Sequence, residues 1–460
     1  MNAIVLSAVF GVVMMFSGVF TSHRQTIRGI AIVCLSVLLL SNIAEQFGYQ
    51  FFKFNTRGML SFDSFGLLFN SIAFGSTLLY FFLSARDMEN VGLNLAEYFA
   101  LIFFISCGIG VASSFNTLLM LFLGIEMISI PLYILTGTDK RNLKSNEASL
   151  KYFLMGSFST GLMLMGIALL YGVSGTFQTE QVIRTTENIN PMTIGGILLL
   201  IISMSFKASA APFHFWTPDV YDGAPTVFTA FMATVVKAAV FIAFIKLLGS
   251  SLVRLQSEWQ LIIAIITAVT LFIGNITAVF QQSVKRMLAY SSIAQAGFML
   301  LALFAMNDLA KEGLILYAAA YSLATIGTFA ILTKMKDYTF EGFNGFAKSQ
   351  PVLAATNTVF LLSLAGIPLT AGFFAKYWML AAALKTGKFL WLVIFAILCA
   401  AVSVYYYFRV IQAMYFRDGV VSSEPLVTNR SFKGWLVFLA AVIILLGIFP
   451  QWLLDKLYFL

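Results

Sequence analysis

Long apolar runs with few or no charges recur along the whole chain, and they constrain its fold more than any other feature. Each run holds about 18 to 25 residues, enough for a helix to cross roughly 30 Å of hydrocarbon. The runs do not alternate between apolar and polar residues, as the strands of a membrane β-barrel do. Only 10% of the residues are charged, against about a quarter in soluble domains. The pattern predicts an all-α integral membrane protein with about fourteen transmembrane helices.

The first apolar run, Ile4 to Phe20, lacks a basic leader, so we interpret it as the first span and not as a cleaved signal. The twelfth run is too long for one straight helix and carries Gly366, Pro368 and Gly372 in its middle, so we expect it to be broken. The expected spans cover residues 3–21, 29–46, 62–84, 95–113, 115–136, 148–173, 192–216, 224–249, 258–280, 286–306, 310–334, 350–384, 389–417 and 433–455.

The lysines and arginines are distributed unevenly between the two sides of such a bundle. Loops that follow odd-numbered spans hold most of them, whereas loops that follow even-numbered spans hold fewer. Cytoplasmic loops are enriched in basic residues, so this bias predicts that the odd-numbered loops face the cytoplasm. With an even number of spans, both termini are then expected on the outer side of the membrane.

Four ionisable residues fall inside the predicted spans: Glu126, Lys207, Lys237 and Lys376. A charge at mid-bilayer costs about 2.5 to 3.5 kcal/mol on insertion scales, so such residues mark ion or proton pathways. Moving a carboxylate toward or away from a buried lysine would switch that lysine between holding and releasing a proton. The plainer interpretations are a static salt bridge for Glu126, snorkelling for Lys207 and Lys237, and a structural water pocket at Lys376.

Two predicted spans contain a proline in their middle. Pro212 cannot donate to the carbonyl of Ala208, and Pro368 cannot donate to that of Leu364. Broken helices five spans apart are typical of transporters built from inverted repeats. We therefore expect a three-helix segment over residues 1–90, a first repeat over 91–256, a second, inverted repeat over 257–420 and a last helix within 421–460. Two ordinary proline kinks remain the alternative.

Several polar residues surround the first break. His214 lies two residues after Pro212, where it could relay protons or could simply hydrogen-bond the broken helix. Asp219 and Asp222 precede the next expected helix, so we assign them to capping. The pair Lys285–Arg286 is interpreted as a topology determinant.

The chain contains no glycine-rich nucleotide motif and no cysteine cluster. Cys34, Cys107 and Cys399 lie in three separate apolar runs, which is typical of small buried side chains and not of a metal site or disulfide. We expect no cofactor, no metal and no nucleic acid on this chain. A pump without its own energy source needs an ion gradient or a partner that does redox work.

Three segments resemble the antiporter-like membrane subunits of respiratory complex I, and in particular subunit N of proton-translocating NADH–quinone oxidoreductase. They are EASLKYFLMGSFS at residues 147–159, APFHFWTPDVYDGAPT at 211–226 and GIPLTAGFFAK at 366–376. The resemblance covers essentially the whole chain. Two positions depart from the usual pattern. Leu369 replaces a frequent proline, and Val227 and Phe228 follow Ala-Pro-Thr where Pro-Val is common.

The resemblance implies roles for the matching positions. Glu126 corresponds to the fifth-span carboxylate, Lys207 to its paired lysine, Lys237 to the bridging lysine and Lys376 to the terminal one. The implied activity is proton translocation driven by quinone reduction elsewhere in the complex, in a bacterial plasma membrane. NADH, FMN, iron–sulfur clusters and quinone are expected in partner subunits, which include neighbouring antiporter-like subunits and small helical subunits, with lipids around them.

Three other functions are compatible with these residues. The chain could belong to a multi-subunit cation/proton antiporter, although its Tyr-x-Gly-Ala-Pro-Thr form argues against this. It could be a structural membrane-arm subunit that pumps nothing. It could also belong to a photosynthetic-type complex that accepts electrons from ferredoxin, because the electron donor contacts other subunits.

Overall fold

The computed structural model describes residues 1–184, 190–418 and 428–455. The expected segment boundary at 420 and the C-terminal residues 456–460 lie outside these ranges. Within them the chain is helical and forms no extended strand. The helices are α1 Asn2–Phe20, α2 Arg24–Gln46, α3 Ser64–Val91, α4 Leu95–Ser114, α5 Leu118–Thr136, α6 Leu143–Ser174, α7 Thr179–Arg184, α8 Pro191–Lys207, α9 Trp216–Gly223, α10 Thr226–Phe231, α11 Lys237–Lys246, α12 Gln256–Val279, α13 Val284–Ala305, α14 Asp308–Leu332, α15 Phe346–Ser349, α16 Pro351–Ala365, α17 Ala371–Lys385, α18 Leu390–Phe416, α19 Arg430–Ile448 and α20 Gln451–Leu454.

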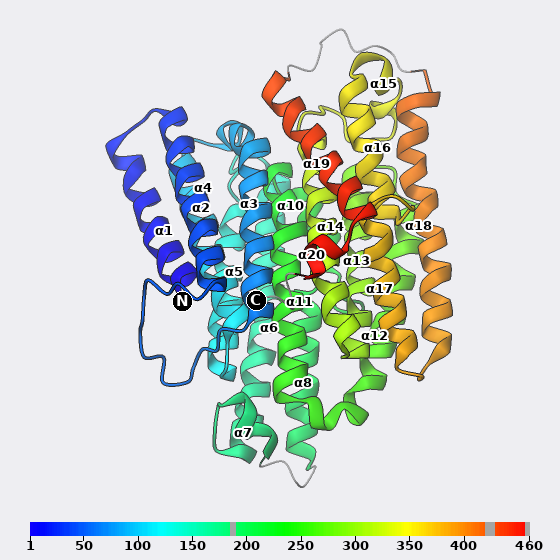
Figure 1. The fold of residues 1–460 in the computed structure, drawn as a ribbon. Helices are drawn as coiled ribbons and strands as arrows, with labels where there is room; N and C mark the ends of the chain where they lie inside the picture. The colour runs from blue at the N-terminus through cyan, green and yellow to red at the C-terminus, as the bar shows by residue number, and fades with distance from the viewer. Residues whose placement is uncertain (185–189, 419–427, 456–460) are drawn as a thin grey trace.

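The helices stand side by side in one bundle, with α1 and α2 along one edge and α18 along the opposite edge (Figure 1). Twelve helical segments within the described ranges are long and apolar enough to cross a membrane. The two discontinuous helices, α8 with α9 and α16 with α17, supply two further crossings. The chain is therefore a multi-pass membrane protein, and the expectation of about fourteen spans is confirmed.

Helix boundaries follow local capping chemistry. Asp63 accepts a hydrogen bond of 2.8 Å from the amide of Gly66, and Asn307 accepts one of 3.0 Å from that of Ala310. Such caps satisfy amides that have no partner within the helix. Pro191 and Pro351 open α8 and α16, where a missing amide proton costs nothing.

Both expected breaks are present. Helix α8 ends at Lys207, and a turn region leads through a cis Ala211–Pro212 peptide to α9. Helix α16 ends at Ala365, and α17 begins at Ala371. Gly366 between them has a φ of 84°, in the left-handed region that glycine adopts without steric cost.

Two departures from the sequence-based boundaries have clear causes. The last span was expected over 433–455, but α19 runs from Arg430 to Ile448, and Pro450 stands between it and the short α20. The eighth span is interrupted by a π-helical turn, Met232–Val236, which joins α10 to α11. Hydrophobicity cannot predict such a turn, because a span with a π-helical turn contains the same apolar residues as an uninterrupted α-helix.

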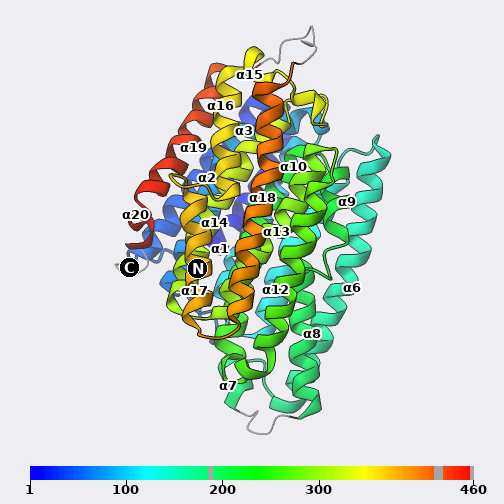
Figure 2. The ribbon, with the colours of Figure 1, turned by 90° about the vertical axis from the view of Figure 1, so that its right-hand side faces the viewer.

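The most enclosed helices lie at the centre of the bundle. The apolar window of the segment Thr226–Ser250 is fully buried, and so is that of α14. Helix α14 packs against α16 and α17, and α13 packs against α9, α12 and α17. The view in Figure 2 shows α13 beside α9, with α6 on the far side of α9. This arrangement brings both broken helices into contact with α13.

Candidate functional site

Glu126 projects from the middle of α5, in a stretch of apolar residues. One turn further on, Pro131 lies inside the helix and has no amide to donate to the carbonyl of Met127. Unlike Pro212 and Pro368, Pro131 leaves its helix continuous, and it was not among the expected breaks. The side chain of Glu126 is 17% exposed, and its Oε1 accepts a hydrogen bond of 2.7 Å from the hydroxyl of Thr160 on α6.

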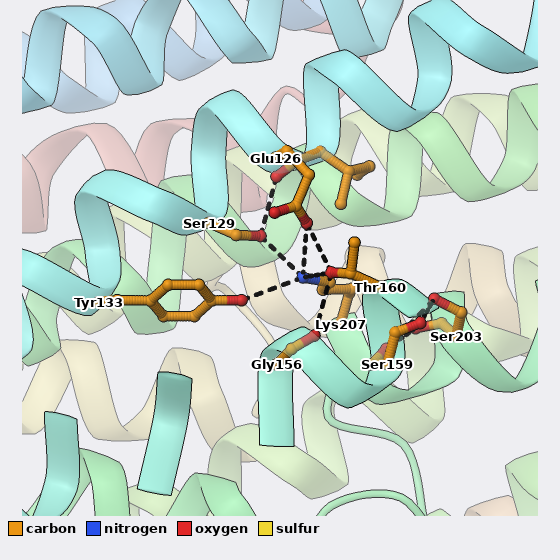
Figure 3. Close-up of polar contacts among 9 residues, drawn as sticks. Glu126, Ser129, Tyr133, Gly156, Ser159, Thr160, Ser203 and Lys207 are labelled. Atoms are coloured by element: carbon orange, nitrogen blue, oxygen red, sulfur yellow. Dashed lines mark hydrogen bonds and ion pairs between the residues drawn. The ribbon is translucent and has the colours of Figure 1, made fainter. Parts of the chain in front are cut away.

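Lys207, the last residue of α8, meets Glu126 in this cluster (Figure 3). Its Nζ lies 3.3 Å from Glu126 Oε1, and the lysine side chain is 5% exposed. The ammonium also donates to the hydroxyls of Ser129 at 2.9 Å, Tyr133 at 3.3 Å and Thr160 at 3.3 Å. A helix C-terminus favours a positive charge, so the position suits a lysine.

The three hydroxyls give Lys207 alternatives to the carboxylate. All three hydroxyls accept from the ammonium, and that of Thr160 also donates to Glu126. The ion pair can therefore lengthen or shorten while the nitrogen keeps hydrogen-bond partners. The pairing of Glu126 with Lys207 was expected from the resemblance. Ser129, Tyr133 and Thr160 were not expected, because single hydroxyl side chains in apolar helices are common.

The break after Lys207 leads directly to α9. Trp216, the first residue of α9, donates a hydrogen bond of 3.1 Å to the carbonyl of Phe206. Its ring stacks at 4.6 Å on Tyr152, which packs edge-on against Tyr133 at 4.8 Å. His214 lies in the break and is 7% exposed. Within the described residues no hydrogen bond joins it to Glu126 or to the three lysines, so its role as a relay stays a prediction.

Lys237 begins α11, immediately after the π-helical turn. It is 2% exposed, and its Nζ donates to the carbonyl of Ser292 at 2.8 Å and to the Ser292 hydroxyl at 2.9 Å. The nitrogen also lies 5.9 Å from the centre of the Tyr221 ring. Among the described residues, no carboxylate lies within ion-pair distance of Lys237. Its ammonium is thus held only by neutral groups.

Lys376 on α17 reaches back across the second break. It is 6% exposed, and its Nζ donates at 2.9 Å to the carbonyl of Ala365 and at 3.4 Å to the hydroxyl of Ser403. The ring of Phe298 lies 4.7 Å away. The nitrogen thus binds a carbonyl that the break leaves without an amide partner, as membrane proteins require at interrupted helices.

Leu369, in the same break, has a φ of 71° and is 70% exposed. A proline ring holds φ near −65°, so the proline that is frequent here could not take this conformation. At the second departure from the usual pattern, Val227 and Phe228 are both buried within α10.

A small cavity beside Lys376 is lined by polar residues that the sequence analysis did not identify. Gln295 on α13 and Tyr317 on α14 contribute to its wall. Gln295 donates to the carbonyl of Leu364 at 2.9 Å and to the hydroxyl of Tyr407 at 3.0 Å, and it accepts from Tyr317. Ser292, which holds Lys237, lies one turn earlier on the same helix. A polar row on α13 therefore runs between Lys237 and Lys376. Gln295, a glutamine in the middle of an apolar span, was the feature of the sequence that could have indicated this polar row.

The charged residues after the first break differ from their expected roles. Asp219 does not cap the following helix. Its carboxylate binds Lys151 at 2.9 Å and Arg286 at 3.1 Å. Lys285 is 3% exposed, although the sequence suggested a loop lysine. It donates to the carbonyls of Asp222 at 2.8 Å and Ala224 at 2.7 Å.

Three kinds of comparison place the chain among known proteins. The model of the family described as NADH:quinone oxidoreductase/Mrp antiporter membrane subunits matches residues 115–403. Subunit N of NADH-quinone oxidoreductase from Cytophaga hutchinsonii is 40% identical over 99% of both chains. The same subunit from Flavobacterium psychrophilum is 37% identical over 99% of this chain and all of the relative.

Solved structures agree. A chain of respiratory complex I from Thermus thermophilus with bound aureothin matches with a TM-score of 0.85 and 31% identity over 99% of both chains. A chain of the Mrp complex from Dietzia shares the fold, with a TM-score of 0.81 at 18% identity over 99% of this chain and 96% of that one. The chain belongs to the NADH:quinone oxidoreductase/Mrp antiporter family of membrane subunits, and within it to the subunit N group of NADH–quinone oxidoreductases.

Proposed function

We propose that this chain moves protons across the membrane through Glu126, Lys207, Lys237 and Lys376, as a membrane-arm subunit of NADH–quinone oxidoreductase. Proton translocation is general to the family. Membership of the subunit N group makes the chain one component of a multi-subunit translocase. Its energy then comes from quinone reduction in other subunits.

The observation that carries the proposal is the environment of Lys207. One buried ammonium is shared between a carboxylate and three hydroxyls at the end of a broken helix. A permanent structural pair would need no such alternatives. When Glu126 moves away from Lys207, the lysine loses its only carboxylate among the described residues and releases its proton more readily. When Glu126 returns, the lysine is reloaded.

From Lys207 the proton passes to Lys237 and then to Lys376. Helix α9 bridges the first interval, because Trp216 contacts the carbonyl before Lys207 and Tyr221 lies beside Lys237. The polar row of α13 bridges the second, because Ser292 holds Lys237 and Gln295 lines the cavity of Lys376. Lys376, or water in that cavity, releases the proton on the outer side.

The proposal extends to the surroundings of the chain. We place it in a bacterial plasma membrane with both termini on the outer side, next to other antiporter-like subunits and small helical subunits. NADH, FMN, iron–sulfur clusters and quinone belong to its partners. The two broken helices then belong to two inverted repeats, over 91–256 and 257–420.

Replacement of Lys207 by alanine in the assembled complex tests the proposal. In sealed inverted membrane vesicles, NADH oxidation and proton uptake are measured together. We expect fewer protons per electron in Lys207→Ala, with the complex assembled. Lys311→Ala is the matched control, because the Lys311 side chain is 56% exposed at the start of α14. An unchanged proton-to-electron ratio in assembled Lys207→Ala would contradict the proposal.

Co-purification separates this function from its alternatives. The tagged chain, extracted in mild detergent, is expected to bring flavin and iron–sulfur subunits that mass spectrometry identifies. Recovery of antiporter subunits alone would indicate a cation exchanger. A purely structural subunit would show altered assembly, but unaltered coupling, when Glu126 or Lys207 is neutralised.

A further inference from the structure

Helix α9 touches the surroundings of two of the proposed proton carriers. At its first residue, Trp216 donates to the carbonyl of Phe206, next to Lys207. Near its end, the ring of Tyr221 lies 5.9 Å from Lys237 Nζ, and the Tyr221 hydroxyl donates at 3.4 Å to the carbonyl of Met232 in the π-helical turn. A shift of α9 would therefore alter the surroundings of both Lys207 and Lys237.

Nothing in α9 itself keeps it in place. It has eight residues, and an isolated helix of that length is unstable. The chain is irregular before Trp216 and extended after Gly223, where Ala224 has a ψ of 153°. Its position must come from contacts with neighbouring helices.

Four charged residues supply such contacts at both ends of α9, and we call them the α9 clamp: Lys151, Asp219, Lys285 and Arg286. At the start of α9, Asp219 binds Lys151 of α6 and Arg286 of α13. At its end, Lys285 donates to the carbonyls of Asp222 and Ala224. Figure 2 shows α9 between α6 and α13, as these contacts require.

Of these four residues, Lys285 contributes most to the stability of the α9 clamp. Asp219, Arg286 and Lys151 have side chains between 35% and 41% exposed, and exposed pairs contribute little. Lys285 is 3% exposed, lies 5.5 Å from the ring of Tyr338, and binds carbonyls at a helix C-terminus, where a cation is favoured. Its removal would leave one buried and one partly buried carbonyl without this donor.

The clamp and the Lys237 site share one rigid element. Lys285 and Ser292 both belong to α13, two helical turns apart, which is about 10 Å along the axis. Ser292 holds the Lys237 ammonium while Tyr221, on the clamped helix, lies beside it. The hydrogen bonds from Lys285 to α9 therefore help to fix Tyr221 relative to Ser292 around the Lys237 ammonium.

We propose that Lys285 is a positioning residue for proton transfer, which fixes α9 to α13 and so keeps Tyr221 and Trp216 in place beside Lys237 and Lys207. The inference rests on the proposed function. Lys285 gives up no proton in this role. Lys285 is required as a donor of two hydrogen bonds, to the carbonyls of Asp222 and Ala224. A side chain that donates but never deprotonates should therefore be able to substitute for it.

The test compares Lys285→Met with Lys285→Arg in the assembled complex, in vesicles that report protons taken up per electron. Methionine keeps the length of the side chain but donates nothing, and arginine donates but stays protonated. We expect the ratio to fall in Lys285→Met and to be retained, wholly or largely, in Lys285→Arg. A wild-type ratio in Lys285→Met, or an equal loss in both variants, would overturn the proposal.

Two further comparisons keep the result interpretable. If Lys285→Met does not assemble, Lys285→Arg alone is compared with the wild type and with Lys237→Ala. A ratio near that of the wild type is expected in Lys285→Arg, and a ratio as low as that of Lys237→Ala would overturn the proposal. Lys237→Ala is measured in parallel. Normal pumping in Lys237→Ala would contradict the proposed function itself, whereas loss there with normal pumping in Lys285→Met would contradict the clamp alone.

Discussion

Lys376 Nζ donates a hydrogen bond of 2.9 Å to the carbonyl of Ala365, the last residue of the helix on the other side of the break. The lysine thus stabilises the end of α16 as well as lying at the end of the proposed proton route. Protonation of Lys376 and the geometry of the break are consequently linked, because a neutral amine donates more weakly than an ammonium.

The hydrogen bond between Lys376 and the carbonyl of Ala365 requires a glycine at position 366. Its φ is 84°, and a Cβ added there would lie 2.8 Å from Lys376 Cδ. We expect Gly366→Ala to displace Lys376 and to lower the proton-to-electron ratio of the complex, beyond a backbone cost of about 1 to 2 kcal/mol.

Gly387 offers a matched control. It has a φ of 67°, but a Cβ there would meet nothing within 4 Å. Gly387→Ala should therefore carry a similar backbone cost without affecting pumping. Equal loss of pumping in both alanine variants would show that strain, and not the displacement of Lys376, is responsible.

Ser292 should contribute only part of the Lys237 site. Ser292→Ala removes the hydroxyl at 2.9 Å from Lys237 but leaves the carbonyl at 2.8 Å. We expect a loss of proton transfer smaller than that in Lys237→Ala, measured as proton uptake per NADH. Ser106→Ala is the control, because the Ser106 hydroxyl is buried and binds the carbonyl of Ile102 in its own helix. A loss in Ser292→Ala as large as in Lys237→Ala would mean that the hydroxyl itself conducts the proton.

The predicted orientation can be tested with two cysteines. Arg141 follows α5 and Lys53 follows α2, and both side chains are exposed. A membrane-impermeant maleimide should label Lys53→Cys in intact cells and Arg141→Cys only in inverted vesicles. The native cysteines, Cys34, Cys107 and Cys399, are buried and should give little background. Labelling on the reverse sides would invert the proposed topology.

The sequence predicted those parts of the site that depend on depth in the membrane. A charge in the middle of an apolar run must lie deep in the bilayer, so Glu126, Lys207, Lys237 and Lys376 could be identified without knowledge of their neighbours. Pro212 and Pro368 likewise indicated the breaks, because a proline in the interior of a helix removes a backbone hydrogen bond.

The sequence could not predict which polar side chains meet across the bundle. Ser129 binds Lys207, but it also donates to the carbonyl of Ile125 in its own helix, as an ordinary serine in a membrane helix does. Lys285 lies at the start of a span, where hydropathy cannot distinguish a loop lysine from a buried one. Both assignments depend on how each helix is rotated and packed, which apolar periodicity does not specify for membrane helices that are apolar on all sides.

Substitution of Thr160 tests most directly whether the Glu126–Lys207 ion pair is movable or static. Its hydroxyl lies 2.7 Å from Glu126 Oε1 and 3.3 Å from Lys207 Nζ, so it can follow either partner when they separate. Thr160→Val keeps the shape and removes the hydroxyl. For a movable pair, we expect the complex to assemble and oxidise NADH with fewer protons taken up per electron.

Thr77→Val is the control for Thr160→Val, because Thr77 is buried in α3 and its hydroxyl binds only the carbonyl of Ala73 in the same helix. Loss of one buried hydrogen bond costs about 1 to 3 kcal/mol, so Thr77→Val should lose thermal stability, and Thr160→Val, whose hydroxyl contacts two charged groups, should lose at least as much. Only Thr160→Val should also lose coupling, because only there does the hydroxyl contact both members of the ion pair. If Thr160→Val lowered the melting temperature and left the proton-to-electron ratio unchanged, the Glu126–Lys207 pair would be a structural salt bridge, and the proton route would have to begin elsewhere.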